Sequence, residues 1–328
     1  MNDQVALLQL MQAKGVGTRT LARTLSKLGE EGRSAAELVA ASADELTRFG
    51  LKPDAARAVG TGRDTAEKVA EELARRGIRM LVRGNPEYPV RLTGVLGDDA
   101  PPVLFAAGNL ALLQRKAVAF CGARDASEDG LLLTDRAARE LAARQINVVS
   151  GHANGVDLTA HAAALAGEGT TTLVLAEGIL RFQAKPGLAA LLADDNFVVV
   201  SEFPPRLPWS VGNAMQRNAT VCGLVDVVIV IEAGQTGGTL AAGEKALQLN
   251  RPLFVIDFSH PPVSAAGNAI LLGRGALPLP CEHGAGPDLT AVFRALSGTR
   301  EPAGIGWRTG SARPLVQRDL FDGVEEAG

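Results

Sequence analysis

The spacing of apolar residues changes near residue 78, and this change predicts two regions of different fold. Before it, apolar residues recur three or four positions apart, as Leu21, Leu25 and Leu28 do, which predicts helices throughout residues 1–77. After it, short runs rich in β-branched residues alternate with helical stretches such as EDGLLLTDRAARELAARQ. The runs are nearly continuous in hydrophobicity, as parallel strands buried on both faces must be. They are IRMLV, AVAFCGA, INVVSG, TTTLVLAEG, FVVVSEF, DVVIVIEAG and PLFVIDF.

The alternation of strands and helices predicts an α/β domain over residues 78–298, with a doubly wound, mostly parallel sheet. Residues 299–328 are rich in Gly, Pro and charge, so we expect a mostly disordered tail that contains a short docking segment, LVQRDLF. The chain is thus expected to have a small helical domain, a larger α/β domain and a tail.

A Gly-Val-Gly turn at residues 15–17 separates two helical stretches of the first region. This is the pattern of a helix-hairpin-helix, whose glycines let backbone N–H groups approach a DNA phosphate. A tight interhelical turn with no ligand explains the same glycines equally well, so both interpretations stay open.

Composition excludes several classes of protein. The 328 residues are 46% hydrophobic and 21% charged, which is ordinary for a globular chain. No apolar run approaches the roughly 20 residues that cross a bilayer, and the N-terminus lacks the features of a secretory signal. Three cysteines without CxxC spacing favour neither a disulfide framework nor a zinc knuckle. We therefore expect a cytoplasmic protein with no membrane partner.

Charge and aromatic content restrict the ways in which the chain could bind nucleic acid. The net charge is −3, so such binding must come from a local cluster of Lys and Arg. Aromatic residues make up only 4% of the chain, which argues against a binding mode built mainly on base stacking.

Three glycine-rich loops follow predicted strands and open predicted helices. They are AFCGARDAS, VVSGHANGVD and IEAGQTGGTLAAGE. Ligands of doubly wound sheets bind at this edge, and unpaired N–H groups and helix dipoles point out of helix N-termini, so the loops predict an anion pocket. None of them matches the GxGxxG or Walker pattern of tight nucleotide sites. The loop residues that we expect to meet phosphate are Gly122, Arg124, Ser127, Ser150, Gly151, Gly155, Gly237, Gly238 and Thr239.

The stretch SGHANGVDLTAH admits a metal site, a catalytic dyad or a phosphate cradle. His152 and His161 are nine residues apart across a loop, unlike the i, i+4 pair of a zinc helix, so we expect no metal. Asp157 and His161 lie at i, i+4 on one helix face, which predicts a hydrogen bond between them. No nucleophile stands at a recognisable spacing, so we interpret this pair as a structural brace.

Glu202 and Glu232 each end a predicted strand beside the expected anion pocket. A carboxylate in such a place usually orients an arginine or backbone N–H groups, and we assign both residues that bracing role. The sequence therefore predicts no catalytic residue and no cofactor.

Six motifs in order resemble those of the DNA processing protein A family (DprA, also called Smf) over about residues 5–280. They are YPVRLTGVLGDDAPPVLFAAGNLALL, GARDAS, SGHANGVDLTAH, SEFPP, QRNATVCGLVDVVIVIEAGQTGGTLAAGEKAL and SAAGNAILLGRGA. The resemblance implies an extended Rossmann-like fold, a homodimer and binding of single-stranded DNA. It also implies delivery of the strand to the RecA recombinase during natural transformation, without catalysis.

The resemblance also assigns residues to the DNA pocket. In the family, the arginine of the second motif and a lysine after a Tyr-Pro pair line that pocket. These roles pass to Arg124 and Lys185, although the pair before the lysine reads Gln-Ala here. The family's Arg-Asn-Arg motif persists as Arg217 and Asn218, with alanine in the third place. Because these departures fall at the pocket, another ligand or another pathway, such as defence against foreign DNA, stays open.

Two alternatives use the same pocket for a small nucleotide-derived ligand. One is a hydrolase, because TGGTLAAGE is similar to the PGGxGTxxE motif of a related nucleotide-processing branch, with Glu244 as acid or base. Thr236 replaces the proline, however, and Glu244 stands one residue further along, so a helix-capping or solvated carboxylate is the simpler interpretation. The other alternative is a sensor of a nucleotide-derived signal.

Overall fold

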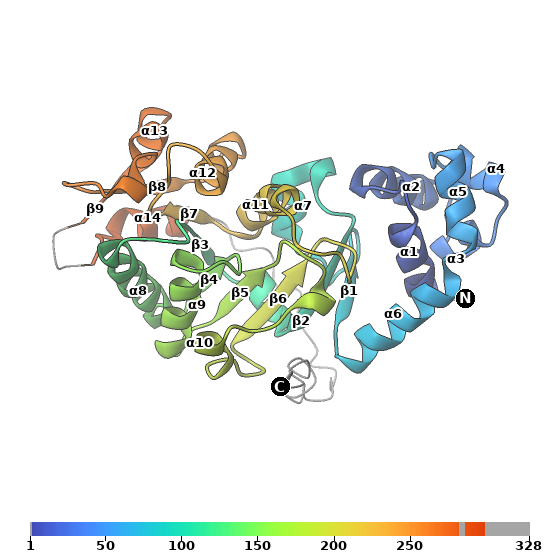
Figure 1. Cartoon of the computed structure of the whole chain (residues 1–328), viewed down its shortest axis with the longest axis horizontal. Coiled ribbons are helices and arrows are strands. Elements are labelled where there is room, and N and C mark those ends of the chain that lie inside the picture. The colour runs from blue at the N-terminus through green and yellow to red at the C-terminus, as the bar shows by residue number, and fades with distance from the viewer. Residues whose placement is uncertain (1, 282–285, 299–328) are drawn as a thin grey trace, which may run out of the picture.

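A nine-stranded sheet organises the larger part of the computed structural model, which describes residues 2–281 and 286–298 (Figure 1). Its strand order is β1-β2-β6-β5-β4-β3-β7-β8-β9. The strands from β6 to β9 run parallel, whereas β2 is antiparallel to both β1 and β6. The strands are β1 Arg79–Val82, β2 Val103–Gly108, β3 Ala117–Cys121, β4 Asn147–Ser150, β5 Thr171–Val174, β6 Phe197–Ser201, β7 Val227–Val230, β8 Leu253–Asp257 and β9 Leu277–Pro280.

The α/β class and the mostly parallel sheet are as predicted, but three strands differ from the prediction. β1 was expected among the buried parallel strands. It is an antiparallel edge strand in which only Leu81 is buried. Neither β2 nor β9 was predicted as a strand. β9 contains two prolines and buries only Leu279, as an edge strand can.

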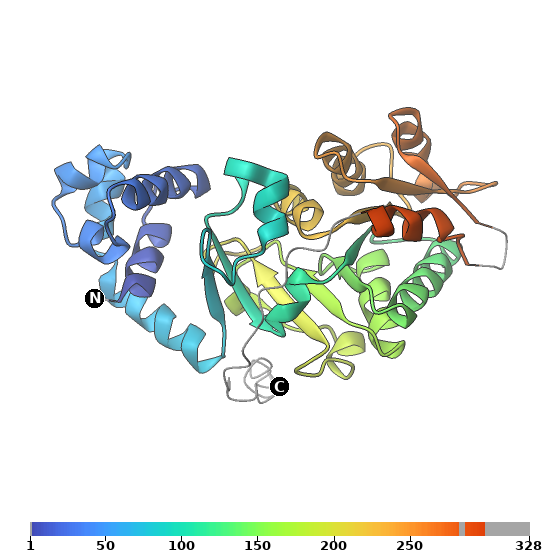
Figure 2. The same cartoon turned by 180° about the vertical axis from the view of Figure 1, so that it is seen from behind.

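Helices cover both faces of the sheet. One face packs against α8 (Glu128–Ala143), α9 (Val156–Ala166) and α14 (Thr290–Gly298). The other packs against α7 (Val90–Leu96), α11 (Val211–Leu224), α12 (Gly238–Gln248) and α13 (Asn268–Gly273), while the short α10 (Pro186–Ala189) lies beside α9. Figure 2 shows α14 next to α8, where the guanidinium of Arg144 lies 3.7 Å from the centre of the Phe293 ring.

Six helices make up the predicted helical region. They are α1 Asp3–Gln12, α2 Thr18–Glu30, α3 Ala35–Val39, α4 Ala43–Arg48, α5 Pro53–Gly60 and α6 Arg63–Arg75. Ser34 and Ser42 begin α3 and α4 because each side chain accepts a hydrogen bond from a backbone N–H three residues later. No helix in the described part of the chain is both long enough and apolar enough to cross a membrane.

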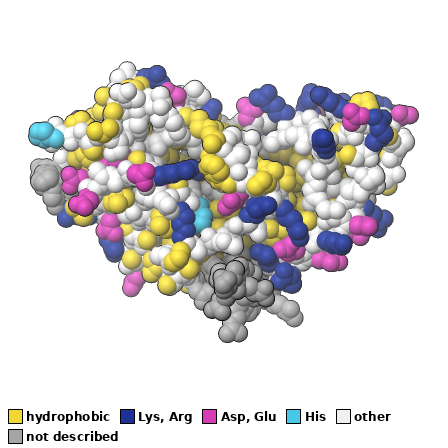
Figure 3. All heavy atoms as spheres, viewed as in Figure 1, with side chains coloured by type: hydrophobic (Ala, Val, Ile, Leu, Met, Phe, Trp, Pro, Cys, Tyr) yellow, Lys and Arg dark blue, Asp and Glu magenta, His cyan; other side chains and the backbone are white. Residues whose placement is uncertain are grey.

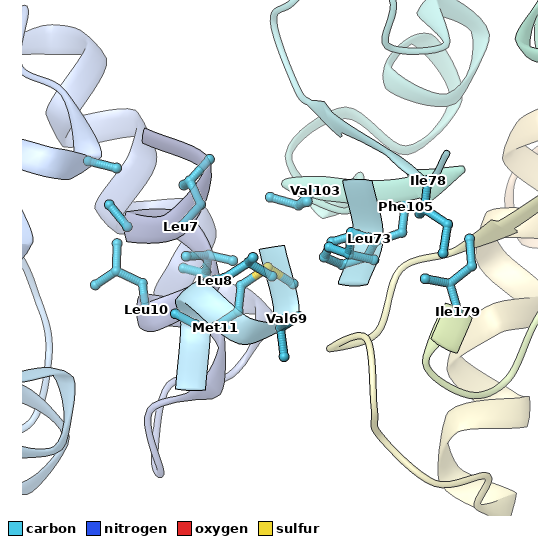
Figure 4. Close-up of a cluster of buried hydrophobic side chains, with 14 of the residues drawn as sticks. Leu7, Leu8, Leu10, Met11, Val69, Leu73, Ile78, Val103, Phe105 and Ile179 are labelled. Carbon is cyan, nitrogen blue, oxygen red and sulfur yellow. The ribbon is translucent and has the colours of Figure 1, made fainter. Parts of the chain in front are cut away.

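The helical region and the sheet share one buried cluster (Figure 4). Leu8 and Met11 of α1 pack with Val69 of α6 at one end of it, and Val103 and Phe105 of β2 lie at the other. The boundaries of the domains predicted from the sequence remain predictions. The predicted tail, with its segment LVQRDLF, lies outside the described residues.

Candidate functional site

The strand order reverses between β3 and β7, because the chain moves outward from β3 through β4 and β5 to β6 and then returns to β7 on the other side of β3. In such sheets ligands bind at the carboxyl ends of the strands beside the reversal. The site is therefore to be sought in the segments that follow β3, β4, β5, β6 and β7.

At the reversal itself, between the ends of β3 and β7, a buried carboxylate of the protein lies where a ligand could bind. Glu232, fully buried at the end of β7, accepts hydrogen bonds from the backbone N–H of Ser127, at 3.0 Å, and from its hydroxyl. The Ser127 hydroxyl in turn accepts from the N–H of Gly130 at 3.0 Å and begins α8. An internal carboxylate thus lies at the N-terminus of α8. Ser127 thus caps α8, and both of its donors are used within the protein, which leaves none for the phosphate that we expected it to meet.

Ser150 does not face the site either. Its side chain is fully buried and its hydroxyl donates to the carbonyl of Phe120 at 2.7 Å. This hydroxyl links β4 to β3 and offers no donor to the ligand that we expected Ser150 to meet.

Two of the predicted glycines serve the close packing of loops. A Cβ at Gly122 would lie 2.6 Å from the Cβ of Val156, at the start of α9. Gly155 has a φ of +70°, and a side chain there would overlap the carbonyls of Ala123 and Arg124. These glycines let the loop after β3 close against the start of α9, which places Arg124 beside that helix.

His161 is a buried brace, but not through Asp157. Its Nε2 lies 2.6 Å from the carbonyl of Gly151 and its Nδ1 lies 2.6 Å from the hydroxyl of Thr171. A carbonyl only accepts, so Nε2 carries the proton, and Nδ1 of the neutral ring is an acceptor that shares the single proton of the Thr171 hydroxyl with the carbonyl of Val148, 2.8 Å from that hydroxyl. Burial lowers the pKa of His161, which agrees with a neutral ring. Both nitrogens are used, so the predicted hydrogen bond to Asp157 is not formed.

Asp157 lies in the first turn of α9, where its Oδ2 accepts from the N–H of Ala153 at 3.3 Å. It therefore braces the loop after β4, although by another contact than the predicted one. In residues 2–281 and 286–298, no three side chains of His, Cys, Asp and Glu gather as a metal site would need.

Three cations from different segments converge near Asp157: Arg124 after β3, Lys185 before α10 and Arg217 on α11. The Nζ of Lys185 donates to Oδ1 of Asn154 at 2.6 Å. Burial lowers the pKa of Lys185 and the charge of Arg124 adds to this, while the carboxylate of Asp157 opposes it. The structure thus brings together the three cations that the resemblance assigned to the pocket. Figure 3 shows Lys and Arg side chains beside a histidine in the middle of the molecule.

Arg217 lies against the backbone of Gly151. A Cβ at Gly151 would lie 2.5 Å from both terminal nitrogens of Arg217 and 2.6 Å from Oδ2 of Asp157. The guanidinium of Arg217 and the carboxylate of Asp157 thus both lie close to the position that a side chain at Gly151 would take. The Nε of Arg217 is buried and has no hydrogen-bond partner among the described residues.

The loop after β7 presents an open helix N-terminus. Gly237 and Gly238 are exposed, and a Cβ on either would meet no atom within 4 Å. Thr239 is half-buried in the first turn of α12. The side chain of Asn218 donates to the carbonyl of Gly238 at 3.3 Å, so Asn218 positions this loop from α11.

Sequence reasoning missed Trp209. The guanidinium of Arg124 lies 5.4 Å from the centre of its ring, and the residue is 46% exposed. Val211 and Met215, on the first turns of α11, are exposed beside it in the sequence. The low aromatic content argued against stacking in general. The signal that could have indicated Trp209 is its place in the polar, proline-rich segment PPRLPWS after a strand.

Glu202 differs from its predicted role. It is buried at the end of β6, and its Oε1 has no hydrogen-bond partner in the part of the chain that the structure describes. Burial raises the pKa of Glu202 to about 7, opposed by the side chains of Thr220 and Gln216 and by the charge of Arg217. Among the described residues no arginine or backbone N–H donates to Glu202, although the charge of Arg217 acts on it, whereas Glu232 accepts from an N–H.

Two further residues bear on the alternatives. His152 packs its ring 5.2 Å from that of Phe182, and burial lowers the pKa of His152 to about 3, so the ring is neutral. Glu244 forms an ion pair with Arg274, which follows α13. This pairing occupies the carboxylate that the hydrolase alternative requires.

Residues 79–283 match the sequence profile of the family described as DNA recombination-mediator protein A. The chain is 29% identical over 204 residues to the DNA processing protein DprA of Bacillus subtilis, covering 61% of this chain and 67% of that protein. It is 34% identical over 191 residues to the DNA processing protein DprA of Streptococcus pneumoniae, covering 58% and 66%. It is 31% identical over 251 residues to a putative DNA processing protein DprA of Mycobacterium tuberculosis, covering 72% and 64%. The chain thus spans about two thirds of the length of these relatives.

Two solved structures share the fold. The DprA of Streptococcus pneumoniae aligns with a TM-score of 0.72 and 24% identity, covering 85% of this chain and 95% of that one. A DNA processing protein A from Helicobacter pylori, described for its single-stranded DNA binding mode, aligns with a TM-score of 0.54 and 24% identity, covering 67% and 94%.

Proposed function

The chain belongs to the DNA recombination-mediator protein A family, and from this premise we propose that it binds single-stranded DNA without catalysing a reaction on it. The observation that carries the proposal is the convergence of Arg124, Lys185 and Arg217 at the carboxyl edge of the sheet. These cations come from three segments, so the fold rather than one local motif assembles the cluster.

The chemistry of the pocket suits a nucleic-acid strand. Cations fix the phosphate backbone and carry most of the affinity, while a base can stack on the exposed ring of Trp209. The open N-terminus of α12, at Gly237 and Gly238, adds backbone donors for another phosphate. The relative from Helicobacter pylori, described for its single-stranded DNA binding, supports the same ligand here.

Three of the groups that could serve as acid or base are engaged elsewhere, which supports a binding role. Glu232 accepts from Ser127, Glu244 pairs with Arg274, and both ring nitrogens of His161 have partners. We expect no change in a labelled strand or a nucleoside monophosphate after long incubation with the protein. Release of free base, lost in Glu244→Gln, would favour the hydrolase instead.

The proposal extends to the pathway. We infer that the chain acts in the cytoplasm as a homodimer that protects incoming strands and helps to load RecA, in transformation and recombination. Family membership supports this inference. The inference predicts that RecA assembles faster on single-stranded DNA when the protein is present, as measured by the DNA-dependent ATPase activity of RecA. It also predicts that the protein sediments as a dimer. An unchanged RecA rate would restrict the proposal to strand binding.

A length series separates a strand from a small ligand. Labelled oligonucleotides of increasing length, with mononucleotides as competitors, are measured by fluorescence anisotropy. A strand-binding pocket loses affinity as the oligonucleotide shortens and ignores mononucleotides. A sensor would bind the mononucleotide as tightly as the longest strand, and that result would overturn the proposal.

A further inference from the structure

The exposed face of α2 carries a row of basic residues that the pocket does not use. Arg19, Arg23 and Lys27 follow one another at intervals of four residues, so they lie on one face of the helix, about 6 Å apart along its axis. Lys14 is exposed in the turn before it. None of these four side chains forms an ion pair with any residue in the described ranges. We call these four residues the α2 basic face.

Four other cations of the same region are paired with neighbouring carboxylates. The ion pairs are Arg33–Glu45, Arg57–Asp54, Arg63–Glu67 and Arg76–Glu72. Residues 1–77 carry twelve Lys and Arg against eleven Asp and Glu, and the α2 basic face supplies four of the eight cations that form no ion pair with a described residue. Figure 3 shows Lys and Arg side chains along the upper margin of this region, where Figure 1 places α2 and α5.

The turn before α2 leaves room for a ligand. Gly17 begins the helix without a side-chain cap, no acidic residue lies in the first turn, and a Cβ at Gly17 would meet no atom within 4 Å. Gly15, with a φ of +94°, packs toward Ala55, so the turn is held from its inner side. The carboxylates of Glu30 and Glu31 lie at the other end of α2, so the anion-attracting part is its N-terminal half.

We propose that the α2 basic face binds the phosphate backbone of duplex DNA, independently of the pocket around Arg124. A duplex is favoured over a single strand because the region offers nothing on which unpaired bases could stack. The only aromatic residue of residues 1–77 is Phe49, which is 1% exposed. Cations alone suit a ligand whose bases are already stacked on one another.

The two sites differ in both chemistry and place. The pocket combines cations with the exposed Trp209 at the strand ends, whereas the α2 basic face has cations alone on a convex helix. Figure 1 shows α2 on the far side of α7 and α11 from α9. A duplex with a single-stranded tail therefore has a site for each of its parts.

The test compares two triple variants of the full chain. Lys14→Gln/Arg19→Gln/Arg23→Gln removes three of the four charges of the α2 basic face and leaves Lys27, whose Nζ donates to the carbonyl of Arg48. The matched control, Arg63→Gln/Lys68→Gln/Arg75→Gln, removes the same charge from exposed positions of α6, which packs on α1. Binding of a short blunt duplex and of a single strand is measured by fluorescence anisotropy over a salt series, with circular dichroism to verify folding.

We expect the first variant to lose roughly tenfold or more in duplex affinity at moderate salt. For this variant, the slope of log duplex affinity against log salt concentration should become shallower by about 2 to 3, because each lost phosphate contact contributes about 0.9. Single-strand binding should stay within about twofold, and the control should keep both affinities. The conservative pair Arg19→Lys/Arg23→Lys should retain duplex binding, because the charge is kept.

Three outcomes would overturn the inference: no duplex binding by the wild type at low salt, an unchanged duplex affinity in the first variant, or an equal loss in the control. A variant that loses both ligands together would mean one shared site instead of two. The proposal that the pocket around Arg124 binds single strands is tested separately, because Arg124→Ala/Lys185→Ala should weaken single-strand binding while duplex binding persists.

Discussion

The guanidinium of Arg124 lies 5.4 Å from the centre of the Trp209 ring, which joins the loop after β3 to the segment before α11. A guanidinium over an aromatic face is held by cation–π attraction and keeps its N–H donors in the plane of the group. The contact thus places a phosphate-binding fork and an exposed aromatic surface side by side. These are the two kinds of contact that a single strand offers, phosphate and base.

Replacing Trp209 tests the aromatic half of that arrangement. Trp209→Ala should weaken single-strand binding by about 1–3 kcal/mol, the usual contribution of one stacked base. Trp209→Phe should retain most of the affinity, because a smaller π-face remains. Anisotropy with a labelled oligonucleotide measures both variants. Equal affinities for the wild type and Trp209→Ala would exclude stacking on this ring.

Replacing Gly151 tests the position of Arg217. A Cβ there would lie 2.5 Å from both terminal nitrogens of Arg217, so Gly151→Ala should displace that guanidinium from the pocket. We expect a loss of single-strand affinity close to that of Arg217→Ala, with a smaller effect on stability because the end of a long side chain can move. Gly212→Ala is the control, since its Cβ would lie 3.8 Å from the Ser210 hydroxyl. An affinity unchanged in Gly151→Ala would remove Arg217 from the binding site.

Glu202 should make stability depend on pH. Burial raises its pKa to about 7, above the ordinary value of 4.5, so the folded state keeps a proton that the unfolded chain releases. Its contribution to stability is full below pH 4.5 and falls as pH rises to about 7, by about 3 kcal/mol in total. Glu202→Gln should remove this loss, so its stability relative to wild type should increase from pH 5 to pH 8 in urea unfolding. A parallel pH dependence in both proteins would contradict the shift.

Glu232 should stabilise the loop after β3. Glu232→Ala leaves the partly buried N–H and hydroxyl of Ser127 without their acceptor, a loss of about 1–3 kcal/mol for an unsatisfied group. Glu232→Gln keeps one acceptor oxygen and should lose less. Urea unfolding measures both variants. If Glu232→Ala were as stable as the wild type, the carboxylate would not be the support of this loop.

The sequence predicted the fold well where strands lie inside the sheet, because burial on both faces leaves continuous apolar runs. It missed β2, which is buried between β1 and β6, and it failed at the edges: β1 is only half-buried and β9 contains two prolines, so neither has the pattern of an inner strand. The helix ends followed local signals, such as Ser34 and Ser42, that a capping pattern makes visible.

The site was predictable as far as local sequence determines it. Arg124, Lys185 and Arg217 were found through motifs, and the structure brings them together. The partners of Ser127 and Ser150 across the sheet, Glu232 and the carbonyl of Phe120, were not predictable in this way, although local sequence does indicate Ser127 as the cap of α8. Helical spacing alone suggested a pair between Asp157 and His161, but the buried ring found its partners on other strands and loops.

The most direct test of the pocket is single-strand affinity across a salt series for the wild type and for Arg124→Ala/Lys185→Ala. Arg139→Ala/Arg144→Ala, at exposed positions on α8 and directly after it, removes the same charge elsewhere and serves as the control. Contacts from three cations predict a wild-type log–log slope of about −2, at about 0.7 per phosphate, and about −0.7 in the pocket variant with a large loss of affinity. An unchanged slope and affinity in the pocket variant would contradict the account.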